Sequence, residues 1–446
     1  MLSLLTLLAL SQVPAPQPTT GAFPYAMVES TLDNGMRVVV IPTDKRGMFA
    51  LYTVVGTGSR DEVEPGYSGF AHFFEHMMFK GTKKVPGDAR TGLLGSLGVD
   101  ESGYTTNDFT TYHLQGPKEA LAKIMELEGD RYQSLDYSEA QFKTESKAVL
   151  GEYNKNFSNP DRKADEAMSD LAFDKHTYKH TTMGFLADIQ KMPNEIKYAK
   201  QFFKRFYTPD NVLLIVAGDV DAAEVQALVK QHFGSWKGKR AKVDLKDEPA
   251  LTKERRKSVP WANPTLERLH VGWRVPSAVR DPKAGALAML LKGYLFSESS
   301  PLFKAVVLDD QLAESIGAGY EPQKDAALFP VTSRIKEGKT PDEVLARVQQ
   351  ALDALAGGAV DQARFDAVRS NLRYGLLMGL TSADSVAGTV AWYSGPGMDP
   401  RAVDKLLAAA AAVTPADLVA FTKAHFGKDQ RAVVTLAHAP AKGGAQ

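Results

Sequence analysis

Apolar and polar positions along the chain predict short strands and amphipathic helices in mixed order. Residues 27–42 hold two extended runs on either side of residues 33–35 (Asp-Asn-Gly), a turn sequence typical of a β-hairpin. Residues 49–55 are mostly apolar and predict a buried strand. The apolar run at residues 68–79 contains no helix breaker after Gly69, so it predicts a helix.

The next stretch predicts a further mixture of elements. Residues 91–97 are expected to form a short helix, and residues 120–133 form an amphipathic helical pattern. Between them, residues 103–114 are rich in threonine and aromatic residues, which predicts one strand. Another helix begins at Ser138, because Gln141 three residues later completes a capping box.

The two halves of the chain repeat one arrangement. Residues 202–219 and residues 421–437 each predict the end of a helix, a turn and a closing apolar strand. Residues 237–264 lie between the copies and are charged, which is typical of a linker. A strand at residues 268–273 then opens the second copy. The predicted division is a signal and tether segment at residues 1–24, an α+β domain at residues 25–236, the linker at residues 237–264, and a second α+β domain at residues 265–440.

The first residues predict export. Residues 2–10 are uncharged and mostly apolar, too few to span a bilayer, and a proline-rich tether follows at residues 13–18. Small residues at positions 9 and 11 suit signal-peptidase cleavage, although no lysine or arginine precedes Arg37. We therefore expect a periplasmic or secreted protein. No later apolar run reaches the length of a transmembrane helix, so we expect no stable membrane insertion.

Composition excludes several classes of partner and site. The 446 residues carry 53 lysines and arginines against 53 aspartates and glutamates, a formal net charge of zero. We therefore expect no nucleic-acid partner, because such proteins need a basic surface. The chain has no cysteine, so neither disulfides nor thiolate metal sites can form.

Candidate metal chemistry lies inside the predicted helix at residues 68–79. His72 and His76 are four residues apart, so their imidazoles project from one helix face and can bind one zinc ion. Glu75 lies on the same side and can act as general base towards a water molecule that the metal activates. The alternative is an ordinary packed or surface pair of histidines. A catalytic zinc normally has three protein ligands, so the motif predicts a third ligand elsewhere.

Two carboxylates on the helix that begins at Ser138 are the candidates for that ligand. Glu145 and Glu152 are seven residues apart and lie on one helix face. Carboxylates at this spacing are most often solvated surface groups. A second histidine pair, His176 and His180, lacks helix character and a nearby acid, so we interpret it as part of a structural loop.

Residues 69–82 (GFAHFFEHMMFKGT) resemble the signature of the pitrilysin family, which includes insulin-degrading enzyme and the mitochondrial processing peptidases. Residues 58–62 and residues 176–184 also fit this family. The resemblance implies a fold of two homologous α+β domains with antiparallel-rich sheets and flanking helices, of which only the first carries metal. It also implies one zinc ion per chain, the ligands His72, His76 and Glu152, the catalytic base Glu75, and the assisting carboxylate Glu145.

The sequence departs from the family pattern in two places. Where relatives that act alone carry an arginine and a tyrosine for substrate and oxyanion binding, this chain has Val307 and Glu314. Valine cannot donate a hydrogen bond, and a glutamate adds negative charge where negative charge develops. In the strand that pairs with substrate, relatives have Asn-Ala-x-Thr, whereas this chain has the candidate substrate-binding residues Ser102, Gly103, Tyr104 and Thr105.

These features together predict a zinc metalloendopeptidase that hydrolyses peptides or unfolded segments. The missing arginine and tyrosine predict a heterodimer in which a homologous subunit supplies them. The alternatives are a non-catalytic peptide-binding or assembly subunit that retains the motif, and a metal hydrolase that cleaves other bonds.

Overall fold

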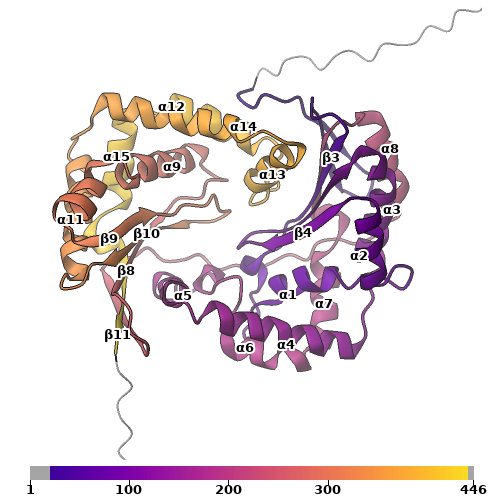
Figure 1. Ribbon diagram of the computed structural model, residues 1–446, viewed down its shortest axis with the longest axis horizontal. Coiled ribbons are helices and arrows are strands. Elements are labelled where there is room, and N and C mark those ends of the chain that lie inside the picture. Colours follow the sequence, from indigo (N-terminus) through magenta and orange to yellow (C-terminus); the bar gives the residue numbers. More distant parts are fainter. Residues whose placement is uncertain (1–20, 440–446) are drawn as a thin grey trace, which may run out of the picture.

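The computed structural model describes residues 21–439 of the protein (Figure 1). The predicted signal segment at residues 2–10 and the tether at residues 13–18 lie outside the described residues. Within the described range, no single helix combines the length and apolarity that a bilayer span requires. Helices α14 (Ala402–Ala412) and α15 (Pro415–His425) reach it only as a pair bent by 107°.

Two separate β-sheets organise the described part of the chain. The first sheet has six strands in the order β1-β2-β6-β3-β5-β4, mostly antiparallel, with β2 and β6 parallel. The second has five strands in the order β7-β11-β8-β10-β9, with β7 and β11 parallel. The strands are β1 (Val28–Thr31), β2 (Arg37–Pro42), β3 (Met48–Val55), β4 (Asp100–Thr105), β5 (Thr110–Pro117), β6 (Val212–Gly218), β7 (Arg255–Trp261), β8 (Arg268–Val275), β9 (Ala313–Ala318), β10 (Ala327–Ile335) and β11 (Arg431–His438).

Helices flank both sheets. We call β1–β6 with α1–α8 the first half and β7–β11 with α9–α15 the second half. The helices of the first half are α1 (Phe70–Met78), α2 (Gly87–Ser96), α3 (Leu121–Ser134), α4 (Glu139–Asn156), α5 (Pro160–Ala172), α6 (Leu186–Lys191), α7 (Ile196–Phe206) and α8 (Ala222–Phe233). Those of the second half are α9 (Pro282–Phe296), α10 (Pro301–Phe303), α11 (Pro341–Ala356), α12 (Gln362–Met378), α13 (Ala383–Ser394), α14 (Ala402–Ala412) and α15 (Pro415–His425).

The halves exchange helices across their junction. Figure 1 shows α13 of the second half beside β3 of the first sheet, and α5 of the first half beside the second sheet. Val386 and Val390 of α13 are fully buried in one apolar cluster with Ile215 of β6. In the opposite direction, Met168 of α5 shares an apolar cluster with Val434 of β11. Each half therefore completes the core of the other.

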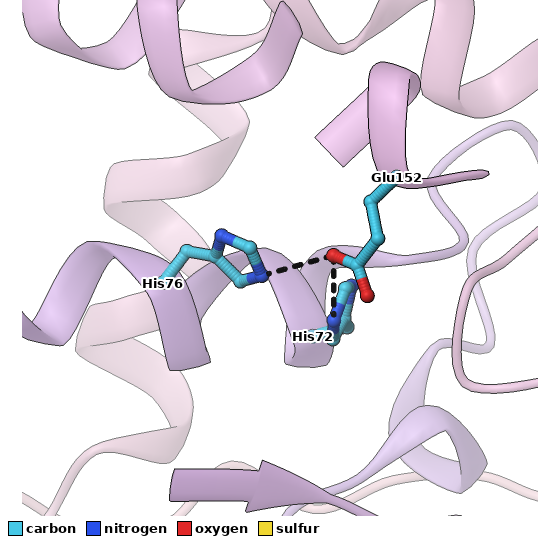
Figure 2. Close-up of side chains that lie close together, drawn as sticks. All are labelled: His72, His76 and Glu152. Carbon is cyan, nitrogen blue, oxygen red and sulfur yellow. Dashed lines mark ion pairs between the residues drawn. The ribbon is translucent and has the colours of Figure 1, made fainter. Parts of the chain in front are cut away.

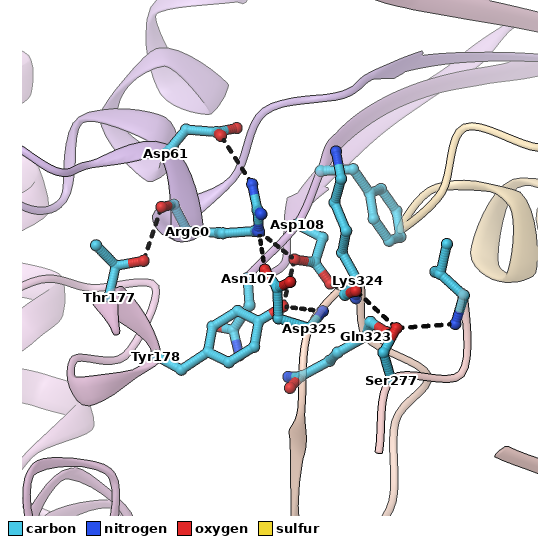
Figure 3. A network of polar contacts seen from close by, with 12 residues as sticks. Arg60, Asp61, Asn107, Asp108, Thr177, Tyr178, Ser277, Gln323, Lys324 and Asp325 are labelled. Carbon is cyan, nitrogen blue, oxygen red and sulfur yellow. Dashed lines mark hydrogen bonds and ion pairs between the residues drawn. The ribbon is translucent and has the colours of Figure 1, made fainter. Parts of the chain in front are cut away.

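A buried polar network also joins the halves (Figure 3). Arg60 donates to Asp325 of the second half at 2.6 Å. Asp108, in the turn between β4 and β5, accepts from the Lys324 backbone N–H at 2.9 Å and from the Tyr178 hydroxyl at 2.6 Å. The turn at the end of β4 is thereby bonded to a loop of the second half.

The predicted fold class is confirmed, and most of the predicted elements are present. The hairpin at residues 27–42 is the antiparallel pair β1 and β2. Ser138 and Gln141 form the predicted capping box of α4. The prediction of one strand at residues 103–114 is wrong, because a turn at residues 106–109 separates β4 from β5. The segment assigned to the linker, residues 237–264, contains β7, which pairs with β11 along its whole length.

Candidate metal centre

Helix α1 separates an apolar face from a polar one. Phe70, Phe73, Phe74 and Met77 are buried in the main core of the first half. The opposite face carries the two histidines and the glutamate of the motif. Just before the helix, Gly69 has a φ of 90°, and a Cβ at this position would lie 2.4 Å from Cδ1 of Ile189. Glycine is therefore required where the chain enters the helix.

Helix α4 brings its carboxylates to this polar face. Oε2 of Glu152 lies 3.6 Å from Nε2 of His72 and 3.3 Å from Nε2 of His76 (Figure 2). One possible ligand atom from each residue lies within 4.8 Å of the others. The structure thus places the three predicted ligands together.

The three side chains fit a zinc ion. Bonds of about 2.0–2.1 Å in tetrahedral geometry place ligand atoms about 3.3 Å apart, close to the separations between Glu152 and the histidines. Burial and the neighbouring His76 lower the pKa of His72 to about 4, which keeps its imidazole neutral and able to bind metal. Two imidazole nitrogens and one carboxylate oxygen are a donor set typical of catalytic zinc sites.

Glu145 supports His76 from behind. Its Oε1 lies 2.9 Å from Nδ1 of His76, and its Oε2 lies 2.5 Å from Nζ of Lys80. The contact with His76, followed by Lys80, lowers the pKa of Glu145 to about 2. An ionised Glu145 accepts the Nδ1 proton, so Nε2 of His76 is left free to face Glu152. Burial lowers the pKa of His76, but the bond to Glu145 and the charges of Glu145, Glu75 and Glu152 together outweigh this effect, so the pKa is raised overall.

Glu75 lies beside the ligands and contacts the first sheet. The hydroxyl of Thr105 donates to its Oε2 at 2.6 Å. Burial raises the pKa of Glu75, and the bond from Thr105 partly opposes that rise. The carboxyl is therefore held in place with a pKa closer to neutrality than that of an exposed glutamate.

A cavity of about 260 Å³ adjoins these groups. Strand β4, which contributes to its wall, is the last strand of the sheet, and among residues 21–439 it pairs only with β5. Of the four candidate substrate-binding residues, Gly103, Tyr104 and Thr105 line the cavity, whereas Ser102 does not. The other lining residues are His72, Glu75, Glu152, Asn156, Phe157, Arg162, Asp165, Thr181, Thr182 and Met183.

Several sequence candidates lie outside this centre. Val307 and Glu314 do not line the cavity, and Glu314 forms an ion pair with Arg334 at 3.2 Å. His176 contacts Asp325 at 3.2 Å, and the ring of His180 contacts its neighbour's carbonyl. The second histidine pair therefore lies in a loop with partners of its own.

The sequence-based prediction does not include two residues that contact the candidate carboxylates. Lys80 lies four residues after His76, and Asn156 lies four residues after Glu152, where its amide contacts Oε1 of Glu152 at 3.4 Å. Spacing of i, i+4 from a candidate ligand is the signal that could have identified both. The bond from Thr105 to Glu75 joins a strand to a helix, and no local spacing predicts it.

Comparisons with known proteins decide the family. Residues 37–185 match the model described as insulinase (peptidase family M16), and residues 196–372 match the model described as the peptidase M16 inactive domain. The chain belongs to peptidase family M16. This confirms the resemblance to the pitrilysin family.

Relatives in this family are similar along most of the chain. The zinc protease PqqE of Helicobacter pylori is 28% identical over 368 residues, which cover 81% of this chain and 82% of that protein. The crystal structure of a protease from Helicobacter pylori superposes with a TM-score of 0.87 at 26% identity, covering 93% of this chain and 99% of that one. The periplasmic protease PqqL of Escherichia coli has the same fold, with a TM-score of 0.72 at 18% identity over 93% of this chain and 48% of that one.

Proposed function

We propose that this M16 protein is a zinc-dependent endopeptidase that acts on peptides or unfolded segments. The observation that carries the proposal is the convergence of His72, His76 and Glu152 beside Glu75, in a cavity walled by a free sheet edge. The relatives named zinc proteases support the same activity. A non-catalytic peptide-binding subunit would need no general base in this position, yet Glu75 is held there by Thr105.

Each side chain has a defined task in peptide hydrolysis. Zinc bound by the three ligands would polarise the scissile carbonyl and make a water molecule easier to deprotonate. Glu75 accepts the proton of the attacking water and later delivers it to the leaving amine. Its raised pKa suits both tasks, because a general base works best near the operating pH. Glu145 keeps the Nδ1 proton of His76 in place throughout.

The free edge of β4 would hold the substrate as an added strand. Main-chain hydrogen bonds provide the affinity in this mode, so unrelated sequences can bind. Gly103 has only a hydrogen towards Glu75, whose Cγ would lie 3.4 Å from a Cβ at this position. A substrate paired with β4 at this position would therefore lie close to the catalytic base.

A homologous partner subunit would complete the active site. The positions of the family's arginine and tyrosine hold Val307 and Glu314, and the carboxylate of Glu314 is paired with Arg334. Loss of one oxyanion donor typically lowers the rate by about a hundredfold or more. We therefore propose a heterodimer in which this chain provides zinc and the partner provides the arginine and the tyrosine.

Export to the periplasm fits the same activity. Residues 2–10 have the composition of a signal segment, and the similar protein PqqL is described as periplasmic. Peptides and unfolded segments in that compartment would be the substrates.

The test is cleavage of a quenched-fluorescent peptide mixture by the purified chain, with bound zinc quantified. The Glu75→Gln variant and a preparation co-expressed with a homologous M16 subunit carrying the arginine and the tyrosine run in parallel. About one zinc per chain, an inert lone chain and an active pair that Glu75→Gln inactivates would support the whole proposal. Full activity of the lone chain would overturn the proposed need for a partner subunit. A pair that binds zinc but cleaves no peptide would overturn the proposed peptidase activity.

A further inference from the structure

The N-terminal end of α1 carries a ligand in its first turn. The helix has nine residues, and His72 is the third of them. The first N–H groups of any helix lack partners within the helix, and a side chain at the N-cap usually accepts one of them. The N-cap here is Gly69, which has no side chain to do so. A short helix with an uncapped first turn would hold His72 poorly.

Glu62 provides the missing cap from an earlier part of the chain. Its Oε2 accepts from the backbone N–H of Gly69 and its Oε1 from that of Ala71, both at 2.7 Å. The side chain is completely buried. One carboxylate thus bonds the residue before the helix and the residue immediately before His72.

The surroundings of Glu62 leave this carboxylate few other tasks. Its only ion-pair neighbour among the described residues is His180, whose Nε2 lies 3.8 Å away, beyond hydrogen-bond distance. This ring nitrogen has no hydrogen-bond partner, whereas Nδ1 of the same ring contacts the backbone. Another buried acid, Asp188, bonds Ser68 and so fixes the preceding residue but not the helix. Both acceptor atoms of Glu62 are therefore used on the entry to α1.

We propose that Glu62 is a positioning residue for metal binding, which fixes the first turn of α1 and with it the imidazole of His72. This inference rests on the proposed function for the identity of the metal. His76 is four residues further on and is held independently by Glu145, so the loss of Glu62 acts mainly through His72.

Zinc affinity of the full chain tests the proposal without any need for activity. The variants are Glu62→Ala, which removes both acceptors, and Glu62→Gln, which keeps the size but presents an amide nitrogen to one backbone N–H. Glu128→Gln is the matched control, because Glu128 is equally buried in the same half and bonds Arg90 and Arg131 rather than α1. Competition with a chromophoric chelator gives the zinc dissociation constant, and cobalt in place of zinc gives a ligand-field absorption spectrum.

We expect Glu62→Ala to weaken zinc binding about 10- to 100-fold, the range typical of residues that orient ligands, and to change the cobalt spectrum. The zinc affinity of Glu62→Gln should lie between those of Glu62→Ala and the parent. If Glu62→Ala does not fold, the affinity of Glu62→Gln tests the proposal. Parental zinc affinity in the folded Glu62 variants, or an equal loss in Glu128→Gln, would overturn the proposal. An unaltered chain that binds zinc but hydrolyses no peptide with its partner would overturn the proposed function and leave the Glu62 result interpretable.

Discussion

At the scale of single residues, burial and neighbouring side chains shift the pKa values of Glu75 and Glu145 in opposite directions. Burial raises the pKa of Glu75, while the hydroxyl of Thr105 stabilises the ionised form. Behind the ligands, Glu145 stays ionised because His76 and Lys80 both contact it. One glutamate is thus adjusted towards proton transfer, and the other remains a permanent acceptor.

Replacing Thr105 with valine should shift the pH dependence of peptide cleavage. The hydroxyl favours the charged form of Glu75, so its loss raises the pKa of that carboxyl further. A hydrogen bond to a charged group contributes about 1.5–3 kcal/mol, which corresponds to roughly one to two pKa units. The acidic limb of kcat/KM in the active enzyme should therefore move to higher pH by about one unit or more. Thr105→Ser should restore the parental profile; coincident profiles for parent and valine variant would contradict this account.

Residue spacing along the chain predicted only part of this centre. The spacing of His72 and His76 places them on one helix face, and the family resemblance selected Glu152 from the two candidates on α4. The Thr105 contact and the cap from Glu62 depend on how separate elements pack. Local periodicity contains no information about such packing, so neither could be inferred before the structure.

At the scale of elements, the β4–β5 hairpin is the feature in which the structure differs most from the sequence-based prediction. Residues 103–114 form an almost continuous run of residues that favour strands, and Asn107 and Asp108 are the only strong turn signal within it. The structure turns at these two residues and leaves β4 at the edge of the sheet. That edge is the surface proposed to bind substrate. A prediction of one continuous strand therefore does not identify the proposed substrate-binding edge.

A methyl group added to β4 should disturb catalysis but not metal binding. In Gly103→Ala, the new Cβ would lie 3.1 Å from the carbonyl oxygen of Thr111, 3.3 Å from Cζ of Phe79 and 3.4 Å from Cγ of Glu75. Strand pairing holds Thr111, so we expect the strain to be relieved by a shift of β4 beside Phe79 and Glu75. Overpacking costs about 1–3 kcal/mol, so we expect kcat/KM to fall about tenfold with unchanged zinc affinity. Gly95→Ala on α2, where the space around the Cβ is open, is the control. Parental activity in Gly103→Ala would contradict the expectation.

At the scale of the whole molecule, the two sheets are not independent cores. Helix α13 covers the first sheet and α5 covers the second, so each half supplies apolar surface that the other needs. Because α5 also lines the metal cavity through Arg162 and Asp165, the helix that stabilises the second half forms part of the site in the first. The internal repeat predicted two similar halves, but it could not predict this exchange, since an amphipathic pattern does not identify the sheet against which a helix packs.

The network between the halves should make stability depend on pH. Burial raises the pKa of Asp108 to about 6 from an ordinary 3.8, despite the hydrogen bonds from Tyr178 and Lys324 that lower it. A folded-state pKa above the unfolded value stabilises the fold below pH 3.8, and this contribution disappears as the pH rises through about 6. The shift of roughly two units corresponds to about 3 kcal/mol.

Urea unfolding of the parent and Asp108→Asn at a series of pH values gives their difference in free energy of unfolding. Asparagine does not titrate, so the parent should lose about 3 kcal/mol relative to the variant between about pH 3 and pH 8. A difference that stays constant over this range would mean that Asp108 titrates normally and that burial does not raise its pKa.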